Sequence, residues 1–160
     1  MRGLMTTRRV ATGMLVAVAV GGISVSAVGA KSATRTDKGT AEIGETSLKG
    51  KLHYEAGSFK DKVLGNGALT FTTTIAIKPG GVVHFDSKSL TFWTKTGSLA
   101  GHVSADIHAS SATSATVTNG KISLTKGTGG QKGHSLVGTF TGKGNPTSTE
   151  YSFAFKAKYK

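Results

Sequence analysis

The sequence predicts an all-β protein, a small antiparallel barrel of about eight strands that follows an N-terminal signal peptide. Three observations lead to this fold class. From residue 46 onward, apolar and polar residues alternate in short stretches, which is the period of a half-buried strand. Glycine, threonine and serine separate these stretches, whereas the whole chain has only 2 prolines. No window has the apolar spacing of an amphipathic helix.

The first 30 residues have the pattern of an export signal. A mildly apolar run over 13–20 follows an arginine-containing start, and Val28 and Ala30 fit a signal-peptidase site before Lys31. A spanning helix needs about 20 strongly apolar residues, so the sequence predicts no transmembrane anchor and a secreted, extracytoplasmic protein. The arginine pair at 8–9 leaves the general secretory and twin-arginine export routes both open.

The remainder of the chain divides into a leader and one domain. Residues 31–45 lack periodic apolar positions and are expected to form a polar, flexible leader. Residues 46–160 are expected to form a single β-barrel domain, because the mature length suits one hydrophobic core.

Charge and cysteine content restrict the partners and the chemistry. After the signal, 17 basic residues against 8 acidic ones give a net charge of +9, and Arg35 is the only arginine among them. Scattered lysines do not resemble the arginine and aromatic surfaces of nucleic-acid readers, so no nucleic-acid partner is expected. The charge is compatible with attraction to anionic cell-envelope polymers, although solvated lysines that serve only solubility explain it better. The absence of cysteine excludes thiol catalysis and thiolate metal sites.

The first four strand segments precede residue 95. They are 46–55, then 68–77, then 82–85 and 89–94 as one strand with a bulge near 86–88. In the second segment, alternation places Leu69, Phe71, Thr73, Ile75 and Ile77 on one face. The stretch 78–81 contains proline and two glycines and is expected to be a turn.

The later strands have clearer local signals. Segment 99–109 turns Val103 and Ile107 one way and His102 and Asp106 the other. The dipeptide at 119–120 is Asn-Gly, which favours a two-residue hairpin that would place Val117 opposite Ile122. A final hairpin is expected to join 135–141 to 151–158, whose last strand carries aromatic residues on one face.

Several segments of the second half resemble a known family. The relevant stretches are Gly-Ser-Leu-Ala-Gly at 97–101, the Gly-Thr-Gly corner at 127–129, Gly-Thr-Phe at 138–140 and the aromatic strand 151–159. Their order and spacing resemble the bacterial branch of the allene oxide cyclase-like and dirigent-like barrels. The resemblance implies an eight-stranded antiparallel barrel with an apolar interior and, as in many plant relatives, a homo-oligomer.

The resemblance also implies a function, because those plant proteins hold a hydrophobic intermediate in a shaped pocket. Dirigent-type proteins use acidic and arginine groups in the cavity, and here Arg35 lies in the expected leader. No catalytic residue is therefore assigned, and binding is favoured over enzymatic activity. Apolar side chains predicted to line the cavity, or else to fill the core, are Phe71, Ile75, Phe92, Tyr151, Phe153, Phe155 and Tyr159.

A metal site is a weaker interpretation. His102 and Asp106 lie roughly 13 Å apart along a strand and cannot share an ion. Asp106 and His108 could do so with a third ligand such as His84 or His134, but a solvent-facing polar stripe explains them better. No metal and no cofactor are expected, and the acidic residues are dispersed with nothing in their spacing that pairs them.

The sequence thus predicts a secreted β-barrel that binds or scaffolds a small hydrophobic molecule. Two alternatives stay open. One is an isomerase or cyclase that uses the same cavity, and the other is a ligand-free structural protein of the cell envelope.

Overall fold

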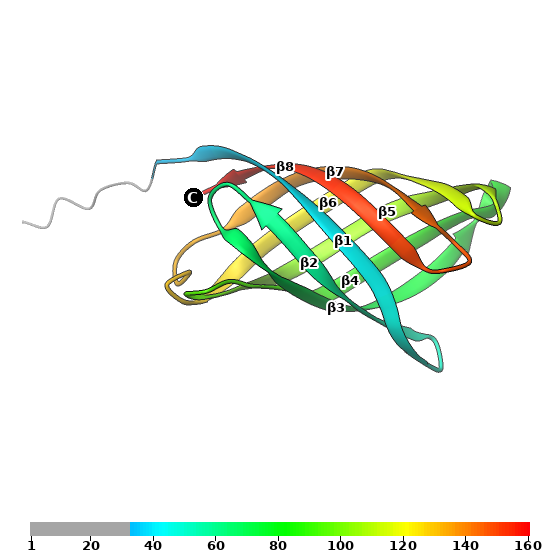
Figure 1. The fold of residues 1–160 in the computed structure, drawn as a ribbon, viewed down its shortest axis with the longest axis horizontal. Coiled ribbons are helices and arrows are strands. Elements are labelled where there is room, and N and C mark those ends of the chain that lie inside the picture. The colour runs from blue at the N-terminus through cyan, green and yellow to red at the C-terminus, as the bar shows by residue number, and fades with distance from the viewer. Residues whose placement is uncertain (1–32) are drawn as a thin grey trace, which may run out of the picture. The chain divides into compact units, whose positions relative to one another are not determined.

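The computed structural model describes residues 33–160, which form a closed antiparallel barrel (Figure 1). Each strand pairs with the next along the chain, and β8 closes the barrel on β1. The predicted all-β, eight-stranded class is confirmed. The expected signal peptide, 1–30, lies outside the described residues. The strands are β1 (Arg35–Lys49), β2 (Leu52–Asp61), β3 (Gly65–Lys78), β4 (Val82–Trp93), β5 (Gly97–Ser111), β6 (Ser114–Gly129), β7 (Leu136–Asn145) and β8 (Glu150–Tyr159).

The two ends of the barrel differ. We call the end that carries the β1–β2, β3–β4, β5–β6 and β7–β8 hairpins the open end; it is at the right in Figure 1. The opposite end, with the turns after β2, β4 and β6, is the plugged end. There Leu64 and Gln131 are buried, and the Tyr159 hydroxyl donates a 3.0 Å hydrogen bond to Oε1 of Gln131. No helix in residues 33–160 is long and apolar enough to cross a membrane.

Aromatic side chains fill the middle of the barrel. Phe59 stacks on Phe92 with ring centroids 4.4 Å apart, and Phe155 meets Phe92 edge-on at 6.1 Å. Phe140 and Phe153 form a further edge-on pair at 5.3 Å. The inward face expected for the last strand is confirmed, since Phe155 is buried and Phe153 packs against the core.

The leader expected over 31–45 is wrong from Arg35 onward, because these residues form most of β1. The inward positions of β1 include Asp37, Gly39 and Ala41, which are too small or too polar to produce an apolar alternation. Packing explains the glycine, because a Cβ there would lie 2.2 Å from Cζ of Phe155. The expected strand 46–55 is likewise divided by a turn at Gly50, whose φ is 62°.

The hairpin expected at Asn119-Gly120 is also wrong. Strand β6 runs through both residues, and its register against β7 shifts between Val117 and Gly120. Asn119 does have a positive φ of 53°, but a bulge accepts that conformation as readily as a tight turn. Val117 pairs with Ile107 of β5 instead of with Ile122, and the hairpin turn lies between Ser111 and Ser114.

Other local predictions are confirmed. The stretch Pro79–Gly81 is a short 3-10 turn in which both glycines have positive φ. Strand β4 is continuous, and its register against β5 shifts between Ser87 and Leu90, where a bulge was expected. In β5, Val103 and Ala105 are buried, as the alternation predicted.

Candidate functional site

A cavity of about 160 Å³ opens at the open end of the barrel. Its walls come from six strands, β1 to β5 and β8, and are mostly apolar. A narrower void of about 40 Å³ lies beside it and shares the side chains of Ile43, Phe71, Phe85 and Phe153. The lining of the larger cavity comprises Ile43, Glu45, His53, Glu55, Phe71, Thr73, Ile75, Val83, Phe85, Ile107, Thr149, Tyr151 and Phe153.

Three ionisable groups project into this apolar cavity from β1 and β2. Glu45 and Glu55 are direct cross-strand partners, and His53 precedes Glu55 by two residues, so all three share the inward face. Nδ1 of His53 lies 2.5 Å from Oε2 of Glu45. The β1 register shifts between Glu45 and Ser47, directly beside the pair. Two carboxyls placed opposite each other repel when both are ionised, so this arrangement destabilises the fold unless one holds a proton.

Glu55 is the carboxyl of this pair whose pKa is raised. Burial, followed by the negative charge of Glu45, raises the pKa of Glu55 to about 7, while nearby His53 acts in the opposite direction. Its Oε2 atom is buried without a hydrogen-bond partner. Burial and the charge of Glu55 also raise the pKa of the Tyr151 phenol. A carboxyl with a pKa near 7 can donate or accept a proton at neutral pH.

The same trio is the set in residues 33–160 whose ligand atoms could surround a metal ion. One atom each from Glu45, His53 and Glu55 lies within 4.8 Å of the others. Ligands of a tetrahedral zinc ion are about 3.4 Å apart, so the 2.5 Å contact between Nδ1 of His53 and Oε2 of Glu45 would have to open before both could bind one ion. The trio is therefore arranged as a close His53–Glu45 pair beside a second carboxyl, and not as a formed zinc site.

The predicted cavity residues separate into three groups. Phe71, Ile75, Tyr151 and Phe153 line the open-end cavity. Phe92 and Phe155 line the narrower void together with Phe71 and Phe153. Tyr159 lies at the plugged end, where its ring stacks on His134 at 5.0 Å. The sequence did not predict this trio, because Glu45 was assigned to the leader and His53 and Glu55 were assigned to a single strand.

A second pair of acids lies at the plugged end. Asp37 is 1% exposed and both of its carboxyl oxygens lack hydrogen-bond partners. Burial and then the neighbouring Asp61 carboxyl raise the pKa of Asp37 to about 7. Oδ1 of Asp61 accepts hydrogen bonds of 2.7 Å from the backbone N–H groups of Val63 and Leu64. Neither Asp37 nor Asp61 lines the open-end cavity or the narrower void.

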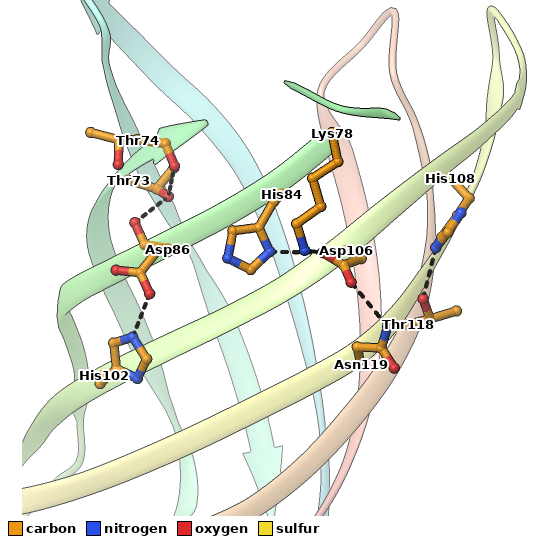
Figure 2. A network of polar contacts seen from close by, with 10 residues as sticks. All are labelled: Thr73, Thr74, Lys78, His84, Asp86, His102, Asp106, His108, Thr118 and Asn119. Carbon is orange, nitrogen blue, oxygen red and sulfur yellow. Dashed lines mark hydrogen bonds and ion pairs between the residues drawn. The ribbon is translucent and has the colours of Figure 1, made fainter. Parts of the chain in front are cut away.

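His84, His102 and His108, which were candidate metal ligands, lie in a polar network on the outer face (Figure 2). Oδ1 of Asp106 accepts from Nζ of Lys78 and lies beside Nδ1 of His84, both at 2.7 Å, while its Oδ2 accepts from Asn119 at 2.9 Å. Lys78, then Asn119 and His84, hold the pKa of Asp106 well below its usual range.

The remaining members of that stripe have separate partners. His102 lies 2.7 Å from Oδ2 of Asp86, and His108 contacts Thr118 at 3.0 Å. Figure 2 shows these contacts spread along β4, β5 and β6 instead of converging on one point. The solvent-facing polar stripe therefore describes them.

Comparison with protein-family models, with curated proteins and with solved structures found no match to this chain. The functional argument therefore depends on the geometry of the barrel itself. Its strongest feature is a mostly apolar cavity that contains one unpartnered carboxyl oxygen, on Glu55, with the Glu45–His53 pair beside it.

Proposed function

We propose that the barrel binds a small, largely apolar molecule in the open-end cavity, with one polar group of that molecule facing Glu55. The observation that carries the proposal is the unpartnered Oε2 of Glu55 among apolar walls. An unsatisfied buried polar atom destabilises a fold by about 1–3 kcal/mol. A ligand hydroxyl, carbonyl or amine would supply the missing hydrogen bond.

The cavity volume limits the ligand. Its 160 Å³ is close to the size of an engineered protein cavity, about 150 Å³, that binds benzene. A single ring with one polar substituent fits these dimensions, whereas a polycyclic molecule does not. Since the pKa of Glu55 is about 7, its carboxyl can donate to a carbonyl or accept from a hydroxyl at neutral pH.

A titration followed by amide NMR tests the proposal, with phenol, cyclohexanone and benzene as probes. We expect shifts confined to residues around Phe71, Val83 and Tyr151, and tighter binding of the two polar probes than of benzene. Glu55→Gln should weaken phenol binding, and Ile43→Phe should block all three probes by filling the cavity. Glu150→Gln, which alters an exposed carboxyl at the start of β8, is the matched control. Absence of any saturable shift at millimolar probe would refute the proposal.

A second candidate function is an isomerase, and the raised pKa of Glu55 beside the Glu45–His53 pair specifically favours it. In this reaction the Glu55 carboxylate removes a proton from the carbon between a carbonyl and a double bond. It then returns that proton to the far end of the double bond, which moves into conjugation. One proton leaves and one is delivered, so no cofactor is required.

Cyclohex-3-enone is a suitable probe of this activity because it matches the size of the cavity. We expect conversion to cyclohex-2-enone, followed by ultraviolet absorbance, with an apparent pKa near 7 in the rate profile. Glu55→Gln should abolish the conversion and Glu150→Gln should preserve it. Binding of cyclohex-3-enone without its conversion would support ligand binding and refute the isomerase.

The setting of this function is proposed as well. The N-terminal pattern supports export from the cytoplasm, and the net charge of +9 on residues 31–160 supports attraction to anionic cell-envelope polymers. The resemblance to allene oxide cyclase-like barrels supports a hydrophobic ligand and a homo-oligomer. Native mass spectrometry of the protein from its secreting host tests these points together, since it reports the mature mass, the oligomeric state and any bound molecule.

A further inference from the structure

Three large aliphatic side chains are exposed where the barrel wall ends at the open end. Leu48 is 57% exposed, Ile75 is 47% exposed and Ile77 is 78% exposed. We call these three residues the lip. Ile75 and Ile77 continue the inward face that contains Phe71, and Leu48 is the cross-strand partner of inward-facing His53. The lip is thus the extension of the cavity wall beyond the closed barrel.

The register explains why the lip is uncovered. The pairing of β3 with β2 ends at Thr73, whereas its pairing with β4 continues to Lys78. The residues of β3 after Thr73 therefore pair with β4 only, and within that pairing Ile77 lies opposite Val83. The β1–β2 hairpin, which carries Leu48, projects from the same end of the barrel, at the lower right in Figure 1, while the β3–β4 turn lies at the upper right.

Lysines accompany the lip. Lys49 and Lys51 are exposed at the β1–β2 turn, and neither forms an ion pair among the described residues. The acidic residues near the open end already have partners, so they offset the charge of Lys49 and Lys51 less. Glu45 is engaged with His53, Asp106 is neutralised by Lys78, and Glu150 accepts a hydrogen bond from Ser148.

We propose that the open end docks on an anionic lipid surface, with the lip inserted among the acyl chains and Lys49 and Lys51 among the headgroups. Exposed aliphatic side chains flanked by lysines are the combination that binds the membrane interface. A second copy of the chain fits less well, because two facing lips would bring four lysines together. Ile75 also lines the open-end cavity, but Leu48, Ile77, Lys49 and Lys51 do not, so docking does not depend on the proposed ligand.

Fluorescence can test the orientation because the chain has 1 tryptophan, Trp93, which lies at the plugged end. Ile77→Trp is made in a Trp93→Phe background, and the protein with native Trp93 serves as the second reporter. With vesicles of phosphatidylglycerol and phosphatidylcholine, the emission of the new tryptophan should shift to the blue and be quenched by brominated acyl chains. Trp93 should show neither effect.

Partitioning onto the same vesicles tests the contributing residues. Ile77→Ser should weaken binding about tenfold, since burial of an isoleucine accounts for at least that factor. Lys49→Gln and Lys51→Gln should each weaken it about fivefold, and pure phosphatidylcholine vesicles should bind poorly. Val137→Ser, which removes an exposed aliphatic group at the plugged end, is the matched control and should have no effect.

Two results would overturn the docking proposal. One is the absence of binding to anionic vesicles. The other is binding in which Trp93 shifts and the lip tryptophan does not, which would mean that the lysines of the plugged end attract the bilayer by charge alone. Loss of probe binding in Glu55→Gln with intact vesicle binding would affect only the ligand, so the two proposals fail separately.

Discussion

Replacing Asp37 by asparagine should stabilise the barrel above neutral pH and reduce the dependence of its stability on pH. Asp37 is 1% exposed, lacks hydrogen-bond partners and lies beside Asp61. Its ionised form is therefore strongly disfavoured in the folded protein. Asparagine has the same shape, carries no charge and can donate a hydrogen bond to the Asp61 carboxyl.

The sign and the size of the effect follow from linkage. The pKa of Asp37 is 3.8 in a free side chain and about 7 in the fold, so the folded state binds more protons between these values. The free energy of unfolding therefore falls as pH rises through this window, at about 1.4 kcal/mol per pH unit. About 3 kcal/mol is lost between pH 5 and pH 8, and the loss is nearly constant above pH 8.

Calorimetry or urea unfolding at pH 5, 6, 7 and 8 measures this slope. For a domain of this size, about 3 kcal/mol corresponds to a fall in Tm of about 10 °C. Asp37→Asn should remove the part of the fall in Tm that Asp37 causes. The part caused by the raised pKa of Glu55 should remain. Glu42→Gln, which removes an exposed carboxyl from the same strand and changes the net charge equally, is the control. An Asp37→Asn protein with the slope of the parent, or with lower stability at pH 8, would refute the reasoning.

Three further predictions concern the barrel wall and core. Phe59→Ala should lower the free energy of unfolding by about 3–5 kcal/mol, measured by urea unfolding, because this side chain is almost fully buried in the aromatic core. Gly57→Ala should reduce Tm sharply, because its Cβ would lie 1.9 Å from a carbonyl oxygen of β1. Gly44→Ala on the facing strand is the control and should be tolerated, because its Cβ would meet no atom within 4 Å. Asn119→Val and Asn119→Gly both lose the hydrogen bond to Asp106, but Asn119→Val should lower Tm further, since only valine resists a positive φ. Equal Tm values for the two variants would contradict the assignment of the bulge.

The fold class could be predicted because most of the barrel shows ordinary alternation. Strand β8, for example, places Phe153, Phe155 and Ala157 on one face, and the structure turns that face inward. Strand β1 could not be found in this way. Its inward positions before Ile43 are Asp37, Gly39 and Ala41, which are small or acidic, and the absence of a side chain at Gly39 is explained only by the position of Phe155.

The candidate site was missed for a related reason. Glu45 and Glu55 become partners only if a turn lies halfway between them, at Gly50-Lys51. Treating 46–55 as a single strand separated the two acids by the full length of an element. The Asn-Gly at 119–120 shows the opposite error, since a positive φ serves a bulge and a hairpin equally and local sequence does not distinguish them.

Both ends of the barrel contain a buried carboxyl with a raised pKa, and a comparison of the two separates stability from function. Asp37 is 1% exposed and lines neither the open-end cavity nor the narrower void, whereas Glu55 faces the open-end cavity. Asp37→Asn and Glu55→Gln should therefore both raise the free energy of unfolding at pH 8, because each removes a charge from an unfavourable place. Only Glu55→Gln should also weaken phenol binding. If Asp37→Asn weakened it equally, the acids would act on the ligand through the stability of the whole barrel, and the assignment of Glu55 as the contact group would be wrong.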